Sequence, residues 1–343
     1  MFADLLEKLQ RRQDLTMDEA AGAMKEIMEG RAQTAQIAGL LIALAMKGER
    51  PAEIVGLART MRGCATRLSR DHAPVFDTCG TGGDRAHTFN VSTVAALVLA
   101  ASGVRVAKHG NRSVSSRCGS ADLFEALGVH ITAEPPVVER CLDETGIAFF
   151  FAPTFHPSMR HAAVTRRDLG VRTAFNLLGP LTNPAGASRQ LVGVPRPELT
   201  ELVARSLALL GSERAWVVHG ADGLDEISTT GCTKISECRK GAVHTFYVHP
   251  ADFGIAKASP AALRGGDAAD NAVIARAVLS GKKGEARDIV VLNAAASLLI
   301  AGEVTTIAEG IQRASAALDS GGAAGVLEKL VSVSNAGRAA AAS

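Results

Sequence analysis

The spacing of apolar and polar residues along this chain changes near residue 70. Before it, apolar residues recur at three- and four-residue spacings, which is typical of amphipathic helices. Leu5, Leu6 and Leu9 mark the first predicted helix. The second opens on a capping box at Thr16–Glu19 and stops near Gly30, the third lies between Thr34 and Gly48, and the fourth runs from Pro51 to about Leu68.

The third predicted helix is apolar on most of its faces. Such a helix has to be covered on more than one side. Complete burial within one molecule would cover it, and so would a second copy of the chain. The pattern leaves both open.

From Pro74 onward, short β-rich runs alternate with helical runs. This alternation predicts a largely parallel sheet with helices on both faces. Residues 233–248 alternate like an antiparallel ribbon at a sheet edge, and the chain from Ala268 is helical. The predicted strands are Val75–Asp77, Val104–Ala107, Ile147–Phe151, Gln190–Val194 and Ala215–His219, and the helices between them lie around 92–102, 120–127, 135–145 and 197–211.

Residues 156–184 interrupt the β/α rhythm with helix-like turns and a Gly-Pro stop, so we assign them to the N-terminal helical part. The predicted fold class is therefore α/β, with a small N-terminal all-helical subdomain, a larger α/β domain with a mostly parallel central sheet, and a ligand cleft between them. The subdomain comprises residues 1–70, completed by about 156–185, and the α/β domain comprises 71–155 and 186–343.

A glycine loop follows the first predicted strand. It places Gly80, Gly82 and Gly83 before Asp84, and the polar cluster Asn90–Thr93 then opens a strongly apolar helix. Glycine lets backbone N–H groups approach an anion, and the helix N-terminus adds free donors and a positive dipole end. The loop has neither the Gly-Lys-Ser/Thr ending of a P-loop nor the GxGxxG spacing of a dinucleotide site. Taken alone, it is equally compatible with a flexible turn and with phosphate binding.

A second loop, Lys108–Asp122, follows the next predicted strand and carries three cations, one histidine and several hydroxyls. A solvated surface loop is the alternative reading. Open α/β sheets, however, bind ligands at the carboxyl ends of their strands, where this loop begins. Two consecutive strand ends with anion-binding groups favour a phosphate site. Ser120 or Asp122 is expected to cap the helix that follows, Leu123–Leu127.

The strand at Ala215–His219 leads into an acidic loop that ends on Asp225 and Glu226. Adjacent carboxylates repel each other, and a divalent cation would relieve that repulsion. Magnesium prefers one or two carboxylates together with substrate phosphates, and Ser92 could add a hydroxyl. A solvated acidic turn is the alternative.

Two adjacent arginines, Arg166 and Arg167, precede Asp168. A guanidinium can hold a carboxylate through two parallel hydrogen bonds. Arg167 could equally form a salt bridge with Asp168, so the residue types alone do not choose between the two arginines.

Composition narrows the class of partner. Lys plus Arg number 37 and Asp plus Glu 35, a net charge of +2, and the chain has one Trp and one Tyr, so neither a basic surface nor a stacking platform for nucleic acid is expected.

The six cysteines form no CxxC pair and are expected to be free thiols in a reducing cytosol. The N-terminus lacks the apolar stretch of a signal peptide, and the longest apolar run, Ile37–Met46, is too short to span a membrane. We therefore expect a soluble cytoplasmic protein.

Several strings in the chain resemble one known family in order and spacing. They are DTCGTGGD, TFNVST, KHGNRSVSS, GSAD, HPSMRHAAVTRRDLGVRTAFNLLGPLTNP and DGLDE, and they extend from Asp77 to Glu226. The family is the anthranilate phosphoribosyltransferases of tryptophan biosynthesis, which are pentosyltransferases within the glycosyltransferases. Small departures are Arg85, Cys118 and the pair Val164–Thr165, none at a position expected to touch substrate.

The resemblance implies a set of site residues. For phosphoribosyl pyrophosphate they are Gly80, Gly83, Asp84, Thr88, Asn90, Val91, Ser92, Thr93, Lys108, His109, Gly110, Asn111, Arg112, Ser113, Val114, Ser115, Ser116 and Ser120. For anthranilate they are Gly80, Asn111 and Arg166, with His109 and Pro153 around them. Two magnesium ions would be held by Ser92, Asp225 and Glu226, with Glu226 bridging the two, and the chain would form a homodimer.

The expected reaction transfers the 5-phosphoribosyl group from phosphoribosyl pyrophosphate to the amine of anthranilate and releases pyrophosphate. No general base is expected, because an aromatic amine is neutral at pH 7 and positioning and electrostatics suffice. Two alternatives remain at this point: a pyrimidine nucleoside phosphorylase of similar architecture, and a non-catalytic relative of the fold that binds nucleic acid.

Overall fold

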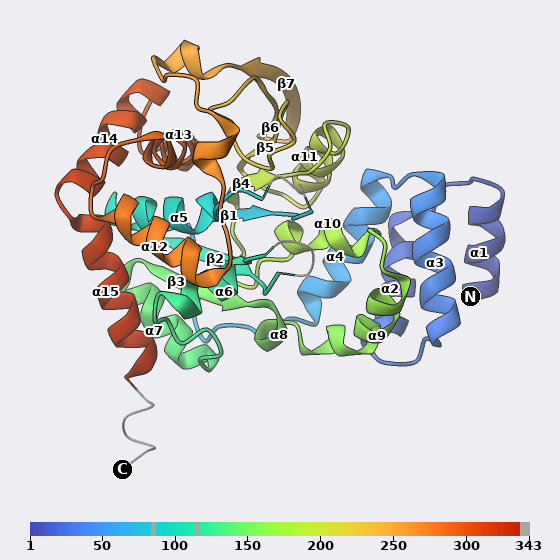
Figure 1. Cartoon of the computed structure of the whole chain (residues 1–343). Helices are drawn as coiled ribbons and strands as arrows, with labels where there is room; N and C mark the ends of the chain where they lie inside the picture. Colours follow the sequence, from blue (N-terminus) through green and yellow to red (C-terminus); the bar gives the residue numbers. More distant parts are fainter. Residues whose placement is uncertain (84–86, 114–116, 337–343) are drawn as a thin grey trace.

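The computed structural model describes residues 1–83, 87–113 and 117–336. Its centre is a seven-stranded sheet in the order β3-β2-β1-β4-β5-β6-β7 (Figure 1). The first five strands are mutually parallel, and β6 and β7 extend the sheet as an antiparallel ribbon at one edge. The strands are β1 Phe76–Gly80, β2 Val106–Gly110, β3 Ile147–Phe151, β4 Arg189–Gly193, β5 Arg214–Gly220, β6 Thr233–Arg239 and β7 Ala242–Val248. The predicted α/β class with a mostly parallel sheet is confirmed.

One face of the sheet is covered by apolar helices. The helix α5 packs on β1 and β2, and α13 packs on β4 and β5. Phe76, Trp216 and Val218 point from the strands into this core. The helices on this side and at the β3 edge are α5 Val91–Ala101, α6 Ser120–Ala126, α7 Pro135–Thr145, α12 Ala268–Leu279, α13 Glu285–Ala301, α14 Ile307–Asp319 and α15 Gly322–Asn335, with the short helices η3 Pro250–Phe253 and η4 Pro260–Leu263.

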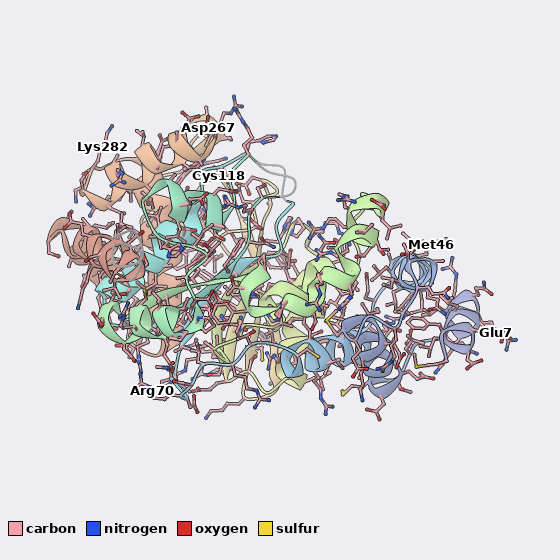
Figure 2. The ribbon with its side chains drawn as sticks, turned by 90° about the horizontal axis from the view of Figure 1, so that it is seen from below. Glu7, Met46, Arg70, Cys118, Asp267 and Lys282 are labelled. Atoms are coloured by element: carbon pink, nitrogen blue, oxygen red, sulfur yellow. The ribbon has the colours of Figure 1, made fainter. Side chains whose placement is uncertain are left out.

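The opposite face shares its core with a bundle of helices, which lies to the right in Figure 1. Val192 and Val217 from the strands, Val203 from α11 and Leu57 from α4 belong to this one apolar cluster. The helices concerned are α1 Phe2–Gln10, α2 Met17–Met28, α3 Thr34–Lys47, α4 Pro51–Gly63 and α11 Leu199–Leu209. Figure 2 shows the same arrangement from below, with Glu7 and Met46 at the outer end of the bundle.

The interrupted segment after β3 consists of short helices, as the sequence predicts. In order they are α8 Ala152–Phe155, η1 Pro157–Met159, α9 Arg160–Leu169, α10 Phe175–Leu178 and η2 Gly179–Leu181. The helix α9 packs against α2 and α3, and α10 packs against α4, while η2 contacts β1 and β2. The segment therefore runs from the helical bundle back to the sheet.

Several predicted boundaries are wrong in ways that have local causes. The fourth helix ends at Gly63 and not near Leu68, because the chain then crosses to α8, where Thr66 N–H donates to Phe155 O over 2.8 Å. Lys108, His109 and Gly110 belong to β2 and not to a loop, since they pair with β3. The helix predicted from Leu123 begins at Ser120, and Asp122 accepts from the N–H of Gly119, its N-cap residue, over 2.9 Å.

The N-terminal capping predictions hold. The Thr16 hydroxyl accepts from Glu19 N–H over 3.1 Å and the reciprocal bond is present, and Pro51 occupies the first turn of α4. No disulfide joins any of the six cysteines, all of which lie in the described ranges. No helix among the described residues has the length and apolarity needed to cross a membrane.

Candidate functional site

Four parallel strands end on glycine at the same edge of the sheet. They are β1, β2, β4 and β5, which end at Gly80, Gly110, Gly193 and Gly220. A Cβ atom at each would come within 2.5 Å of another residue. At Gly193 the obstructing atom belongs to the backbone, so glycine is required there, whereas at the other three the nearest atom belongs to a side chain. The sequence singled out Gly80 and Gly110 as ligand contacts but gave no reason to notice Gly193.

The acidic loop after β5 folds over two of these glycine ends. A Cβ at Gly80 would lie 2.5 Å from Asp225 Oδ2, and a Cβ at Gly193 would overlap the backbone oxygen of Asp225. Asn293 of α13 holds the loop: its amide accepts from Ile227 N–H and donates to Ile227 O, each over 2.9 Å. The sequence places Asp225 and Glu226 after a strand, and the structure brings Asp225 directly onto β1 and β4.

The loop has its own internal brace in Asp222. Its carboxylate accepts from the Ser228 hydroxyl over 2.5 Å and from the Thr230 hydroxyl. It also accepts from Leu224 N–H over 3.2 Å. Asp222 therefore shapes the turn that presents Asp225 and Glu226, a role that the sequence did not reveal.

Lys108 brings a buried cation under this edge. Its ammonium group donates to Thr78 O and lies 3.3 Å from Ser92 Oγ, and the residue is only 1% exposed. Burial lowers the pKa of Lys108, and the charges of Asp77, Glu226 and Asp225 act in the opposite direction. The arrangement joins the cation, the Ser92 hydroxyl and the acidic loop in one place.

The helix α5 points its N-terminus at the same edge. Asn90 is its N-cap, and its side chain accepts from Thr93 N–H over 3.1 Å. Asn271 in turn accepts from Asn90 N–H over 2.8 Å. The Thr93 hydroxyl is buried and has no hydrogen-bond partner among the described residues. Val91 is buried in the core beside it.

The predicted phosphate loops are described only in part. Asp84 lies outside the described residues, as do Val114, Ser115 and Ser116. Thr88 forms an isolated β-bridge with Arg264.

Arg112 pairs with two carboxylates of α6. Its guanidinium lies 3.1 Å from Asp122 and 2.7 Å from Glu125. Asn111 is exposed and accepts from Arg112 N–H over 2.8 Å, and Ser113 N–H donates to Asp122 over 3.0 Å. A Cβ at Gly110 would overlap the Ser120 hydroxyl, so Ser120 does lie on the strand end.

Arg172, which follows α9, ties the glycine loop to the helical segment. Its guanidinium donates to Gly82 O over 2.5 Å and to Thr81 O over 3.3 Å. A Cβ at Gly83 would overlap it. The sequence reasoning missed this residue, because Arg172 and Gly82 are 90 positions apart.

The two adjacent arginines of α9 differ clearly. Arg167 is exposed and lies 3.4 Å from Asp168. Arg166 is partly buried with its guanidinium 5.4 Å from the centre of the Phe175 ring, and no carboxylate among the described residues pairs with it. Burial lowers the pKa of Arg166, which nevertheless stays charged at any ordinary pH. Of the two adjacent arginines, only Arg167 is therefore paired with a carboxylate among the described residues.

Two buried histidines lie between the end of β2 and the turn after α8. The rings of His109 and His156 are 5.2 Å apart, and His109 Nδ1 lies 3.0 Å from Gly179 O. Burial lowers the pKa of His109 to about 3 and that of His156 to about 4, so both are neutral. Pro153 lies in α8, just before this turn.

No group of three or more His, Cys, Asp or Glu side chains within the described ranges is arranged to hold a metal by itself. At the strand ends the chain offers two carboxylates, Asp225 and Glu226, and the Ser92 hydroxyl. These are hard oxygen donors, the kind that magnesium takes.

Comparison with known proteins gives two family matches that cover most of the chain. Residues 72–324 match the glycosyl transferase family α/β domain, and residues 3–65 match the helical bundle domain of the same family. Among curated proteins, the anthranilate phosphoribosyltransferase of Moorella thermoacetica is 56% identical over 331 residues, which is 96% of this chain and 98% of the relative. That of Symbiobacterium thermophilum is 52% identical, over 95% of this chain and 96% of the relative.

Solved structures agree with the sequence matches. The anthranilate phosphoribosyltransferase of Thermus thermophilus superposes with a TM-score of 0.90 at 44% identity, covering 97% of this chain and 99% of the other. The enzyme of Saccharomyces cerevisiae in complex with phosphoribosyl pyrophosphate and magnesium gives 0.88 at 27% identity, over 98% of both chains. The same yeast enzyme in complex with 4-fluoroanthranilate gives 0.86 at 26% identity, over 98% of this chain and 99% of the other. By its sequence and by its fold, the chain belongs to the anthranilate phosphoribosyltransferase family.

Proposed function

We propose that this chain transfers the 5-phosphoribosyl group of phosphoribosyl pyrophosphate to the amine of anthranilate, giving N-(5-phosphoribosyl)anthranilate and pyrophosphate. The observation that carries the proposal is the convergence at one sheet edge of glycine strand ends, a buried cation, a helix N-terminus and two carboxylates. Each of these suits a polyphosphate ester, and Arg166 suits a carboxylate. The curated relatives named above carry the same activity in their names.

The pyrophosphate is proposed to lie over Gly80, Gly83 and the α5 N-terminus. There the backbone N–H groups of the first turn and the free Thr93 hydroxyl are available as donors. The buried ammonium group of Lys108 contributes positive charge next to Thr78 and Ser92. The remaining residues proposed around phosphoribosyl pyrophosphate are Asp84, Thr88, Asn90, Val91, Ser92, His109, Gly110, Asn111, Arg112, Ser113, Val114, Ser115, Ser116 and Ser120.

Asp225, Glu226 and Ser92 are proposed to hold magnesium, two ions per site. Their oxygen donors fit this ion, and Asp225 lies against the glycine ends of β1 and β4. When bound with the substrate, magnesium neutralises the departing pyrophosphate as a Lewis acid and orients it.

Anthranilate is proposed to bind with its carboxylate on Arg166 and its ring near Gly80 and Asn111, with His109 and Pro153 around it. Arg166 stacks on Phe175 and is therefore held in place before any ligand arrives. The neutral state of His109 avoids a second positive charge that would compete for the carboxylate.

In this geometry the chain promotes the reaction by aligning the two substrates. The anthranilate amine attacks the anomeric carbon from the face opposite the pyrophosphate, with inversion, through an oxocarbenium-like state. No residue has to remove a proton before the attack, because the amine is neutral. We assign no general base, and we attribute the acceleration to alignment and to charges fixed by the fold.

The apolar face of α3 supports the proposal of a homodimer. Ile37, Leu40, Leu41 and Leu44 are buried within the molecule, whereas Met46 on the same helix is 74% exposed (Figure 2). Ala45 is exposed too, and Ile42 is only half-buried. A second copy of the chain would cover this face, and an Ile42→Glu substitution is expected to shift the molar mass measured by light scattering from two chains to one.

We further propose a cytoplasmic location and a division of the chain at residue 70. Six cysteines without a disulfide suit a reducing compartment. The helical part would comprise residues 1–70 with about 156–185, on the grounds that α9 and α10 pack on the bundle helices.

The test of the proposed reaction is the loss of anthranilate fluorescence on mixing the protein with phosphoribosyl pyrophosphate, in magnesium and in EDTA. A decay that needs both the sugar and the metal supports the proposal. The double variant Asp225→Asn with Glu226→Gln is expected to lose the dependence on magnesium together with most of the activity. A flat trace from folded protein would refute the transferase, and thymidine with phosphate would then test the phosphorylase alternative.

A further inference from the structure

A buried carboxyl group lies within β1, three residues before the strand ends at Gly80. It belongs to Asp77, which is 0% exposed. Its Oδ1 accepts from His109 N–H over 3.2 Å, and its Oδ2 accepts from the side-chain amide of Asn183 over 2.8 Å. Burial raises the pKa of Asp77, whereas the charge of Lys108 and these two hydrogen bonds act in the opposite direction. A carboxyl group removed from water needs such donors, so Asp77 depends on both partners.

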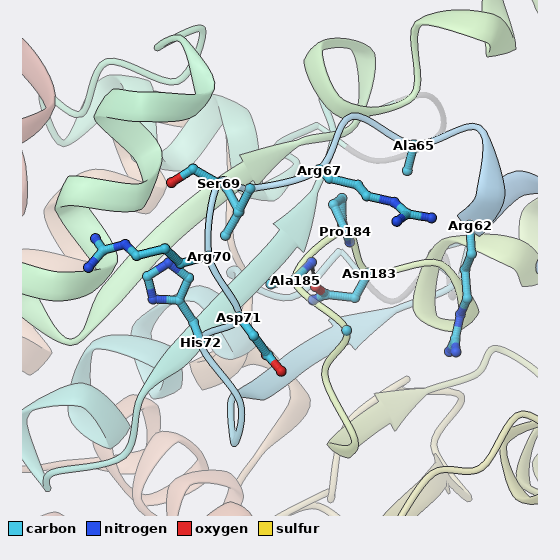
Figure 3. A pocket seen from close by; sticks show the side chains of 12 residues that line it. Arg62, Ala65, Arg67, Ser69, Arg70, Asp71, His72, Asn183, Pro184 and Ala185 are labelled. Atoms are coloured by element: carbon cyan, nitrogen blue, oxygen red, sulfur yellow. Dashed lines mark hydrogen bonds between the residues drawn. The ribbon is translucent and has the colours of Figure 1, made fainter.

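The orientation of the Asn183 amide is fixed by its other contacts. Its Nδ2 also donates to Ala107 O over 2.7 Å, and its Oδ1 accepts from Ala185 N–H over 2.9 Å. Turning the amide over would break both bonds and would place its oxygen against Asp77 Oδ2. Asn183 lies on the stretch of chain that leads into β4, beside a groove of about 440 Å³ (Figure 3). It therefore ties this stretch to both β1 and β2.

His109 makes the second connection of Asp77. Its backbone N–H is bound by the Asp77 carboxyl group, and its ring Nδ1 lies 3.0 Å from Gly179 O in η2. A carbonyl oxygen only accepts hydrogen bonds, so Nδ1 carries the ring proton. Gln190 of β4 fastens the same short helix, because its side-chain amide donates to Pro180 O over 2.7 Å. The helix η2 is thus held to β2 and β4 by buried side chains.

These contacts connect the two proposed substrate surfaces. The end of β2, which carries Lys108 and His109, belongs to the surface proposed for the sugar phosphate. The helix η2 directly follows α10, which begins at Phe175, and the guanidinium of Arg166 lies 5.4 Å from the centre of the Phe175 ring. Asp77 therefore lies at the junction between the strand ends and the helical segment that supports the anthranilate surface.

We propose that Asp77 is a positioning residue, which sets the anthranilate surface relative to the strand ends by binding His109 and Asn183 together. Asp77 is expected to contact neither substrate, since no part of it is exposed. This role rests on the proposed transferase function. Its loss should lower kcat, because the two substrates are aligned less well. Each KM should stay nearly unchanged, because Arg166 and the strand ends remain in place.

The test is steady-state kinetics of Asp77→Asn, measured by the anthranilate fluorescence decay. The new amide has one oxygen, which can still accept from His109 N–H, but its NH₂ group then faces the NH₂ group of Asn183. We expect kcat to fall by about 10- to 100-fold and both KM values to change by less than about threefold. An unchanged kcat would overturn the proposal, and so would a rise in KM that accounts for the whole loss of kcat/KM.

Asn183→Ala is a second variant, which keeps the buried carboxyl group. Water from the adjacent groove can replace the lost amide, so the variant is expected to fold, and its kcat should fall by about tenfold. Asp77→Asn made in the Asn183→Ala background meets no opposing NH₂ group and should lower kcat by less than about threefold further. An equal cost of Asp77→Asn in both backgrounds would overturn the connection through Asn183.

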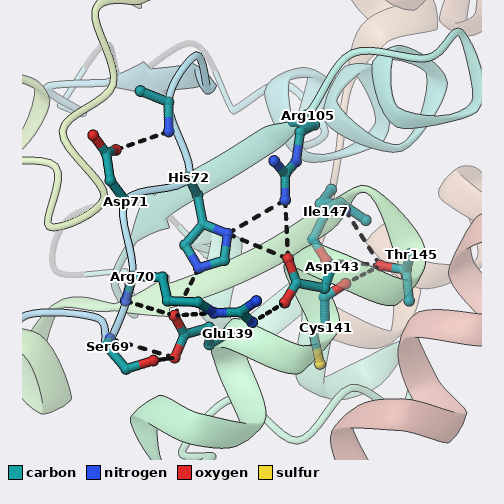
Figure 4. A network of polar contacts seen from close by, with 11 residues as sticks. Ser69, Arg70, Asp71, His72, Arg105, Glu139, Cys141, Asp143, Thr145 and Ile147 are labelled. Carbon is teal, nitrogen blue, oxygen red and sulfur yellow. Dashed lines mark hydrogen bonds and ion pairs between the residues drawn. The ribbon is translucent and has the colours of Figure 1, made fainter.

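Glu139→Gln is the matched control, because it also turns a buried carboxylate into an amide (Figure 4). Glu139 of α7 accepts from the Ser69 hydroxyl over 2.6 Å and lies 2.7 Å from His72 Nε2. Arg105, the residue before β2, lies 3.3 Å from His72 Nδ1, so this network is at the amino end of β2 and away from its glycine end. Glu139→Gln should lower the free energy of unfolding and leave kcat within about twofold of the parent. An equal fall of kcat in Glu139→Gln and Asp77→Asn would reduce the effect to lost stability and overturn the proposal.

A readout independent of the transferase reaction is the ¹⁵N NMR spectrum of protein labelled in its histidine rings. The parent and Glu139→Gln are expected to show His109 with the proton on Nδ1. Asp77→Asn is expected to shift that signal, because displacement of Asn183 moves η2 and with it Gly179 O. An unchanged His109 signal in Asp77→Asn would overturn the network even in an inactive chain. A parent chain that shows the signal but no fluorescence decay would refute the proposed function and not the network.

Discussion

Gly193 is the position where one added methyl group should damage the site most directly. A Cβ there would lie 1.7 Å from the backbone oxygen of Asp225, whereas real Cβ contacts are essentially never under 3.0 Å. The obstacle is backbone, so a side-chain rotation cannot relieve it. The acidic loop must move by about 1.3 Å, the difference between these distances. Gly193 itself has an ordinary extended conformation, so Gly193→Ala tests the contact and not backbone strain.

A displacement of about 1 Å at a positioning group commonly lowers the rate by about 100-fold, or about 2.7 kcal/mol in transition-state stabilisation. We therefore expect Gly193→Ala to lower kcat/KM for phosphoribosyl pyrophosphate by about 100-fold and to raise the magnesium concentration needed for half-maximal rate. The overpacking should also lower the free energy of unfolding by about 1–3 kcal/mol.

The assay is the anthranilate fluorescence decay at varied magnesium, with circular dichroism to show that the variant is folded. Gly325→Ala is the matched control, since a Cβ there meets nothing within 4 Å, and it should leave both measurements unchanged. A folded Gly193→Ala protein with activity and magnesium requirement within about threefold of the parent would refute the role given to the Asp225 loop.

Three further predictions concern side chains around the site. Arg166→Ala should raise KM for anthranilate by roughly 10- to 100-fold and leave KM for phosphoribosyl pyrophosphate nearly unchanged, whereas Arg167→Ala should change neither KM. Steady-state kinetics with each substrate varied in turn measures both constants. Equal effects of Arg166→Ala on the two KM values would count against its role. Arg172→Ala should instead raise KM for phosphoribosyl pyrophosphate by roughly tenfold, because the glycine loop loses its tie, and Arg172→Lys should restore little of it because an ammonium group lacks the planar fork. The pKa values of His109 and His156 in the folded chain, about 3 and about 4, lie below the ordinary value of 6.5. Between these values the unfolded chain binds more protons than the folded chain. The free energy of unfolding should therefore fall as the pH drops from 7 to 4. Urea unfolding at pH 7 and pH 5 measures this, and His156→Gln should show a smaller fall than the parent; an equal fall would be inconsistent with the pKa argument.

The elements of this fold could be predicted from the sequence because their signals are local. Alternating β and helical runs gave the five parallel strands and the edge ribbon, and Thr16 with Glu19 gave a capping box that the structure contains. Strand ends were less predictable, since Lys108 and Gly110 join β2 only through pairing with β3.

The site could be predicted only where its chemistry lies in one stretch of chain. The glycine loop and the acidic pair are such stretches, and their proposed ligands remain predictions. Arg172 and Asn293 were not foreseen, because each acts on a segment 90 or 66 residues away and neither carries a local signature. Gly193 escaped notice for the same reason, since only the folded path of the acidic loop shows why a side chain is excluded there.

The single apolar cluster that joins the bundle to the sheet has a consequence for how two substrates meet. Ala162 of α9, four residues before Arg166, belongs to the same cluster as Val192 of β4, one residue before Gly193. The surface proposed for anthranilate and the surface proposed for the sugar phosphate are thus anchored in one packed interior. Most of the conformational entropy lost in aligning the two surfaces is therefore lost when the chain folds. Less is lost each time the substrates bind.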